Sequence, residues 1–123
     1  MLGRNRVRIL VAIEEDYRSY REVIAGAIGA IRPQFEVATA GVGALDEEVK
    51  RFDPHLVICS LPATSGSVER MAWLELSLDP HRPSVVCVGG RHTEVHNPLL
   101  DTLLEVIDQV EDLVDADDNV RDD

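Results

Sequence analysis

Three groups of residues in this sequence are of types that could bind a metal or an anion. The first is the acidic cluster Glu14, Glu15 and Asp16, which directly follows an apolar run. Carboxylate oxygens are the ligands that Mg²⁺ and Ca²⁺ prefer. The alternative interpretation is a solvated helix start, where acidic side chains interact favourably with the helix dipole. Both interpretations place the cluster at the end of a strand.

The second group is Gly89, Gly90 and Arg91, which follow another apolar run. Glycines after a strand can let the backbone approach a phosphate, and an arginine can bind it. The complete dinucleotide-binding and Walker glycine patterns are missing from the chain. A tight turn is therefore the alternative interpretation for these glycines, and also for Gly41 and Gly43.

The third group is the histidine pair His92 and His96, four residues apart. On a helix this spacing could hold Zn²⁺. Thr93 and Val95 fit an extended segment equally well, which favours exposed histidines without a metal. We predict no cofactor and no resident metal.

The two cysteines, Cys59 and Cys87, each lie within an apolar run. Buried free cysteine behaves as a small hydrophobic residue, and an apolar environment raises the pKa of a thiol and makes it inert. Two cysteines without a signal peptide do not form a disulfide framework. In a receiver-like sheet their strands would be neighbours. We predict no redox role for either residue.

Length and charge restrict the possible partners. A chain of 123 residues suits one domain, and its net charge of −11 opposes binding to nucleic acid or to an anionic membrane. The apolar run 7–13 is interrupted by Arg8, too short for a membrane span and lacking a cleavage signal. These features predict a cytoplasmic protein whose partner is a protein or a second copy of itself.

Hydrophobic periodicity predicts an α/β domain over residues 7–114, between a flexible N-terminus, 1–6, and a disordered acidic tail, 115–123. Apolar, β-branched runs predict strands at 7–13, 35–39, 56–59 and 85–88. Helical spacing and helix boundaries predict helices over 16–31, 45–52 and 98–114. Alternation of strands and helices in the first half implies parallel strands joined by right-handed crossovers.

The segment Ala72–Leu78 alternates with period two and favours a strand, with a helix as the alternative. The short turn 79–83 that follows it predicts antiparallel pairing with 85–88, and an edge position for 72–78. The predicted fold is therefore a sheet of about five strands, mostly parallel, with one antiparallel edge strand and about three helices.

From Arg8 to about Ser60 the chain resembles the receiver domain of bacterial response regulators, which has a flavodoxin-like fold. The likeness rests on the acidic cluster 14–16, on the strand–helix–strand spacing that follows it, and on the segment 53–62. The resemblance implies a regulatory role in signal transduction. It also implies a metal-binding acidic pair in the cluster 14–16.

The sequence departs from the receiver pattern at the reactive positions. The phosphoacceptor falls on Ser60 when counted from Pro54, and on Ile58 when counted back from Pro62 and Gly66; neither is a carboxylate. The hydroxyl residue of the fourth strand would fall near Val88 or Gly89. The chain's one lysine, Lys50, belongs to the predicted second helix. Phosphoryl transfer needs these groups for positioning and charge stabilisation, so we expect a receiver-like domain without phosphorylation chemistry and without enzymatic activity.

Apolar residues on the last predicted helix cover more than one stripe. The excess predicts a second contact, and receiver-like domains often pair through this face, which suggests a homodimer. The candidate dimer residues are Leu100, Leu104, Ile107 and Val114. The alternative is a helix wedged between the sheet and the loop 61–71.

Three functions therefore stand as hypotheses. The first is a non-catalytic regulatory or protein–protein interaction domain. The second is a small-ligand or metal-binding domain that uses Glu14–Asp16, Ser60 and Gly89–Arg91. The third is an enzyme with an unrecognised site, for which the sequence offers no nucleophile–base pair.

Overall fold

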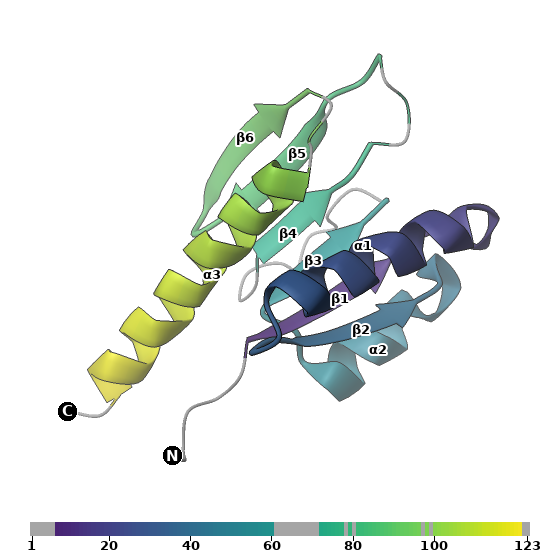
Figure 1. The fold of residues 1–123 in the computed structure, drawn as a ribbon. Coiled ribbons are helices and arrows are strands. Elements are labelled where there is room, and N and C mark those ends of the chain that lie inside the picture. The colour runs from purple at the N-terminus through teal and green to yellow at the C-terminus, as the bar shows by residue number, and fades with distance from the viewer. Residues whose placement is uncertain are drawn as a thin grey trace.

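The chain folds into one six-stranded sheet with helices on both faces, as the computed structural model shows (Figure 1). The structure describes residues 7–60, 72–77, 79, 81–96, 98 and 100–121, with side chains up to residue 116. The strands are β1 (Arg8–Ala12), β2 (Glu36–Ala40), β3 (Leu56–Cys59), β4 (Ala72–Glu75), β5 (Ser84–Val88) and β6 (Arg91–Val95). The helices are α1 (Arg18–Ile31), α2 (Leu45–Phe52) and α3 (Leu100–Arg121), and two short 3₁₀ turns, η1 (Glu15–Tyr17) and η2 (Val42–Ala44), precede α1 and α2.

The strand order is β2-β1-β3-β4-β5-β6, and its first four strands are parallel. Every residue of β3 is buried, as are four of the five residues of β1. Strands covered on both faces read as continuous apolar runs, which is why 7–13 and 56–59 were recognisable in the sequence. The predicted parallel strand–helix–strand core is confirmed.

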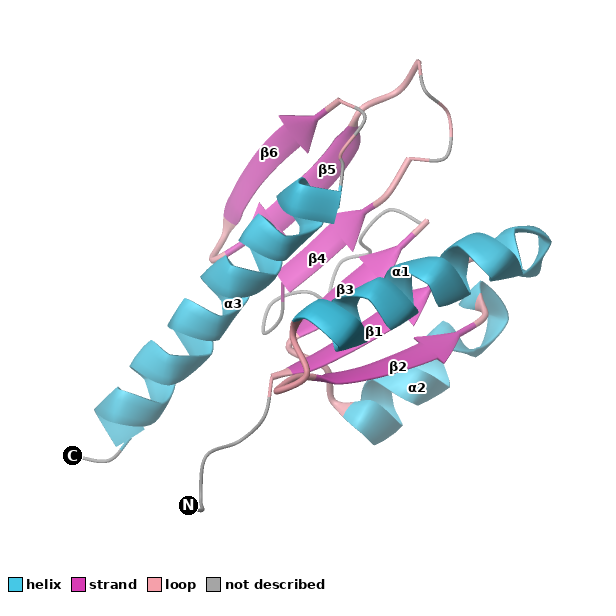
Figure 2. Cartoon of the chain, in the orientation of Figure 1, coloured by secondary structure: helices cyan, strands magenta, loops and turns pink. Residues whose placement is uncertain are grey.

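The second half of the sheet differs from the prediction in two respects. The strand β4 pairs in parallel with β3 and antiparallel with β5, so the segment 72–75 is central and not an edge strand. Its predicted antiparallel pairing with 85–88 is confirmed. The expected five strands are six, because β6 adds an antiparallel edge to β5 (Figure 2). Leu78 and the loop 61–71 lie outside the described residues.

Side chains alternate between the two faces of the sheet along each strand, so the apolar core forms two layers. On one face, α1 and α3 pack against the side chains of Ile9, Ile58 and Leu74; on the other, α2 packs against Leu10 and Val57. Figure 1 shows α1 and α3 in front of the sheet and α2 behind it. Helices on opposite faces follow from right-handed crossovers that leave β1 and β2 in opposite directions across the sheet.

Local contacts fix where α2 ends. Asp53 adopts a left-handed conformation with φ of 51°, and its backbone N–H donates to the Val49 carbonyl at 2.9 Å. Pro54 then stops the helix. The Arg8 side chain donates from Nε to the Asp53 carbonyl at 2.8 Å, and the Arg8 backbone N–H donates to Nδ1 of His55 at 2.9 Å. His55 therefore has a structural partner.

The last helix is longer than the apolar pattern predicts, since it continues to Arg121 instead of ending near Val114. It begins at Leu100. Asn97, a residue type that can cap a helix, directly precedes the predicted helix 98–114 but lies outside the described residues. No helix in the described part of the chain combines the length and apolar character needed to cross a bilayer.

Candidate functional site

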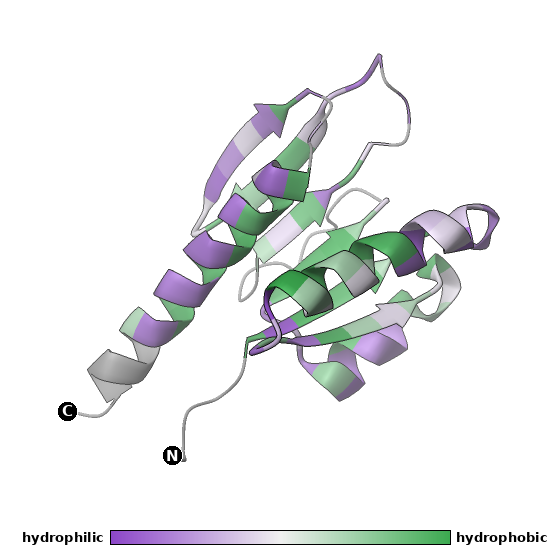
Figure 3. Ribbon diagram, viewed as in Figure 1, coloured by the Kyte–Doolittle hydropathy of each residue, from purple (hydrophilic) through white to green (hydrophobic). Residues whose placement is uncertain are grey.

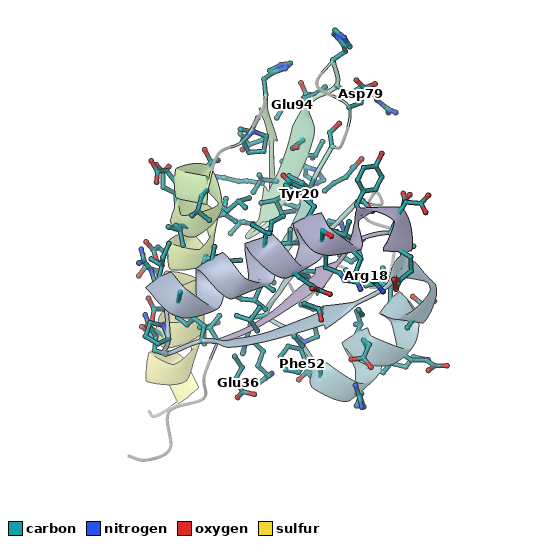
Figure 4. The ribbon with its side chains drawn as sticks, turned by 45° about the vertical axis from the view of Figure 1, so that its right-hand side comes forward. Arg18, Tyr20, Glu36, Phe52, Asp79 and Glu94 are labelled. Carbon is teal, nitrogen blue, oxygen red and sulfur yellow. The ribbon has the colours of Figure 1, made fainter. Side chains whose placement is uncertain are left out.

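The carboxyl ends of β1, β2 and β3 meet at one edge of the sheet, and the chain leaves them toward opposite faces. In α/β sheets this arrangement creates a crevice where ligands bind. Figure 4 makes the two edges visible: Asp79, which follows β4, lies at one end of the molecule, and Glu36, which begins β2, lies toward the other. The site expected from sequence should therefore gather around the residues that follow β1 and β3.

The acidic cluster lies at this edge, in the short connection between β1 and α1. Glu14 is half-buried and precedes η1, whereas Glu15 and Asp16 are exposed within that turn. Among the described residues, no three His, Cys, Asp or Glu side chains converge in a way that could hold a metal ion. The geometry thus favours the solvated start of a helix over a cation site.

Arg21 is the residue at this edge whose importance the sequence did not reveal. Its side chain is only 9% exposed, and its Nη1 donates to the Ile13 carbonyl at 2.9 Å and to the Ala40 carbonyl at 3.2 Å. It thereby joins the residue that follows β1 to the last residue of β2, next to the final ladder pair of Ala12 and Ala40. The same nitrogen lies 3.4 Å from Oε1 of Glu15, so one carboxylate of the acidic cluster already has a cationic neighbour.

Close packing around this arginine explains the glycine that follows β2. A methyl group added at Gly41 would lie 3.2 Å from Oε1 of Glu15 and 3.7 Å from Nη1 of Arg21. Gly41 therefore leaves room for the ion pair. No signal in a single sequence distinguishes such an arginine from an exposed one.

Ser60, the position expected from the resemblance, follows β3 directly. Its backbone N–H approaches the Ala12 carbonyl at 3.4 Å, and its hydroxyl is buried. Within the described part of the chain, neither this hydroxyl nor Nε of Arg21 has a hydrogen-bond partner. Ile58, the other candidate position, is fully buried inside β3 and faces the core under α1 and α3.

Gly89, Gly90 and Arg91 do not belong to this edge. Because β5 is antiparallel to β4, its last residue lies beside the start of the parallel strands. Both glycines have positive φ, 59° and 82°, and join β5 to β6 in a two-residue turn. That conformation is the one that hairpin turns require. The tight-turn interpretation is confirmed for Gly89 and Gly90. The residues of the predicted ligand site therefore lie at opposite ends of the sheet.

The same hairpin brings two chemically active side chains together. Cys87 and His92 are directly opposed, and Sγ of Cys87 lies 3.1 Å from Nδ1 of His92. The sequence contained the signal, because a Gly-Gly turn between Val88 and Arg91 pairs position 87 with position 92. The histidines 92 and 96 are on or beside a strand, so the helical zinc geometry is wrong.

Cys59 and Cys87 are separated by β4, so the expectation that their strands are neighbours is also wrong. The two residues do not form a disulfide. His81, in the turn before β5, is exposed.

The residues predicted as a dimer face on the last helix pack mainly against other parts of the same molecule. Ile107 is fully buried, and Leu104 and Val114 pack against the apolar core, while Leu100 is half-buried. The wide apolar arc of α3 follows from the breadth of the sheet it covers. Leu113 is the large apolar side chain that α3 exposes in its described part, at 48%.

The sequence matches no family model, and neither a curated protein nor a solved structure is detectably similar to the chain. Interpretation of the site therefore rests on the geometry described above. The outer side of α1 carries one further surface feature.

The outward side of α1 is apolar and exposed. The run from Val23 to Ile31 consists only of Val, Ile, Ala and Gly, in a chain with 28% charged residues. Ile24 and Ile28 face the core, but Val23 is 66% exposed and Ile31 is 43% exposed. Figure 3 shows apolar colouring over most of this helix. A helix that is apolar on all sides is normally covered on all sides.

The two glycines of α1 point away from the sheet, because a methyl group added at Gly26 or Gly29 would meet no atom within 4 Å. They therefore do not serve to bring α1 closer to the sheet. Together Val23, Gly26, Gly29 and the exposed Ala30 form a shallow, uncharged surface, here called the α1 surface.

Proposed function

We propose that this chain is a non-catalytic regulatory domain, a receiver-like module without phosphorylation chemistry, which acts by binding protein through the α1 surface. The partner that fits this surface is a second copy of the chain. The observation that carries the proposal is the exposure of an uncharged, apolar helix face on a protein with a net charge of −11. Contiguous apolar patches of this kind mark interaction sites.

The receiver-like part of the proposal is supported by the order β2-β1-β3-β4, with α1 and α2 on opposite faces. Flavodoxin-like domains share this order. The absence of phosphorylation chemistry is supported by Ser60, which stands at the tip of β3 where a receiver has its acceptor carboxylate. A serine hydroxyl needs a neighbouring base to act as a nucleophile, and within the described residues the hydroxyl of Ser60 has no such partner.

The choice of a second copy follows from charge and shape. Glu22 precedes the uncharged run and Arg32 follows it. Two α1 helices related by a twofold axis perpendicular to them run antiparallel, and in that arrangement Glu22 of one copy faces the Arg32 end of the other. The outward glycines Gly26 and Gly29 allow two helix backbones to approach closely, because the distance between packed helices depends on the side chains at the contact.

Sedimentation equilibrium of the wild type and two matched variants tests the proposal. Val23→Glu places a charge on the α1 surface, whereas Leu113→Glu places the same charge at a similarly apolar, exposed position on α3. We expect a wild-type dimer, a monomeric Val23→Glu variant and a dimeric Leu113→Glu variant. A monomeric wild type, or dissociation caused by Leu113→Glu alone, would contradict the assignment.

A second candidate function is ligand binding at the tips of β1 and β3. It is favoured by two buried polar atoms that have no hydrogen-bond partner among the described residues, the Ser60 hydroxyl and Nε of Arg21. Unpaired buried groups call for an explanation such as a bound ion or water. Thermal shifts against nucleotides and divalent cations test this candidate, since a ligand specific for the native state raises stability; no shift with any of them removes it.

A further inference from the structure

The pair formed by Cys87 and His92 is independent of the α1 surface and of the crevice at the strand tips. The two residues are cross-strand neighbours on the β5–β6 hairpin, and Sγ lies 3.1 Å from Nδ1 and 3.8 Å from Nε2 of the imidazole. The hairpin is fixed by the two-residue glycine turn, so this distance does not depend on a long flexible loop.

The two cysteines of the chain differ in access to solvent. Cys59 is fully buried, whereas Cys87 keeps 9% of its surface exposed beside His92, which is itself exposed. Cys87 is therefore the more accessible of the two cysteines to a small reagent. Cys59 serves as an internal control in the same molecule.

The resting form of Cys87 is the protonated thiol. Burial, followed by the negative charge of Glu75, raises the pKa of the Cys87 thiol above its ordinary value. In the tautomer whose Nδ1 carries no hydrogen, the protonated thiol donates to Nδ1, and the imidazole is then placed to accept the proton when the sulfur attacks. A base within hydrogen-bond distance of a weak nucleophile can activate it by accepting its proton.

The sequence alone predicts no redox role for either cysteine, but it does not show the histidine beside Cys87. We propose that Cys87 is a site of covalent thiol oxidation, with His92 as its base and a small hydroperoxide as the oxidant. The thiol proton passes to Nδ1 while sulfur attacks one peroxide oxygen and the O–O bond breaks. Sulfur is oxidised by two electrons to the sulfenic acid, and the peroxide is reduced to the corresponding alcohol or water, whose leaving oxygen takes the proton from His92. The first oxidation product of a cysteine is this reversible sulfenic acid.

The test uses hydrogen peroxide, with dimedone to trap sulfenic acid and peptide mass spectrometry to locate it. In the wild type we expect the label on Cys87 and not on Cys59. His92→Gln, at an exposed position, should slow labelling about a hundredfold, a typical contribution of a positioned base. Thr93→Gln, the exposed neighbour that points to the other face of the strand, should leave the rate unchanged.

A second variant separates chemistry from structure. Glu75→Gln removes a charge that opposes loss of the thiol proton, so it should increase the rate of labelling, which a purely structural pair would not show. Equal rates in the wild type and His92→Gln would overturn the proposal, as would labelling of Cys59 before Cys87. Thermal melting confirms that each variant is folded before its rate is compared.

Discussion

Arg32 and Asp108 form a two-point ion pair that ties the end of α1 to the middle of α3. The guanidinium donates from Nε to Oδ1 at 3.2 Å and from Nη2 to Oδ2 at 3.1 Å. This hydrogen-bonded pairing raises the pKa of Arg32. It connects the two helices that cover the same face of the sheet. A second acidic residue, Glu111, lies one turn further along α3.

Glu111 makes stability depend on pH. Burial raises its pKa above the ordinary value of 4.5, with smaller contributions from Asp115, Asp108 and Asp112, while Arg32 acts in the opposite direction. A carboxyl whose pKa is higher in the folded state favours folding when protonated, so its contribution is lost as the pH rises through that value. Glu111→Gln should therefore stabilise the protein at neutral pH and have no effect well below pH 4.5. Urea denaturation at both pH values measures the difference; equal effects at both would contradict the assignment.

The buried bonds of Arg21 should make it one of the most sensitive positions in the chain. Arg21→Met leaves the carbonyls of Ile13 and Ala40 without their shared donor, and we expect a loss of roughly 2–4 kcal/mol in the free energy of unfolding. Arg18→Met, on the exposed first turn of the same helix, should change it by less than about 0.5 kcal/mol. Chemical denaturation of the two variants gives the comparison, and similar losses would show that the bonds to the strand tips contribute little.

Replacement by alanine should change the stability of the protein in opposite directions at two glycines that differ in backbone conformation. Gly90 has a positive φ with open space around it, so Gly90→Ala isolates backbone strain and should destabilise the protein by about 1 kcal/mol. Gly26 is helical and open within a single copy, so Gly26→Ala should stabilise the dissociated chain, at a protein concentration too low for association, by up to about 1 kcal/mol. Thermal melts distinguish the two signs, and stabilisation by Gly90→Ala would contradict the turn geometry.

Incubation with acetyl phosphate and Mg²⁺ should leave the intact mass of the protein unchanged. The residue that follows β3 is Ser60 and not a carboxylate, and the acidic cluster 14–16 does not converge on a cation site among the described residues. A mass increase of one phosphoryl group that hydroxylamine removes would indicate an acyl phosphate. That result would refute the absence of phosphorylation chemistry.

The sequence predicted the parallel core well because burial on both faces imposes a simple pattern. The runs 7–13 and 56–59 are apolar, and Asp53-Pro54 marks the end of α2 in the sequence as in the structure. The edge strand β6 was missed because Arg91, His92, Thr93 and Glu94 are all exposed, and a strand with that exposure has no hydrophobic alternation. Its glycine turn was the available signal.

The candidate site was predicted less completely, for a topological reason. Strand direction decides which end of a sheet a residue occupies, and the reversal at β5 moved Gly89–Arg91 away from Glu14 and Ser60. The burial of Arg21 and the exposure of Val23 depend on how α1 is rotated over the sheet. Helical periodicity alone could not fix that rotation, because apolar residues occur on every side of the helix.

Amide spectra of ¹⁵N-labelled protein, recorded from concentrated to dilute solution, test most directly whether the chain associates through α1. The account predicts concentration-dependent shifts concentrated between Ser19 and Ile31, with those around Leu113 and along β6 unchanged. Shifts confined to β6 or to α3, or spectra that do not depend on concentration, would contradict it.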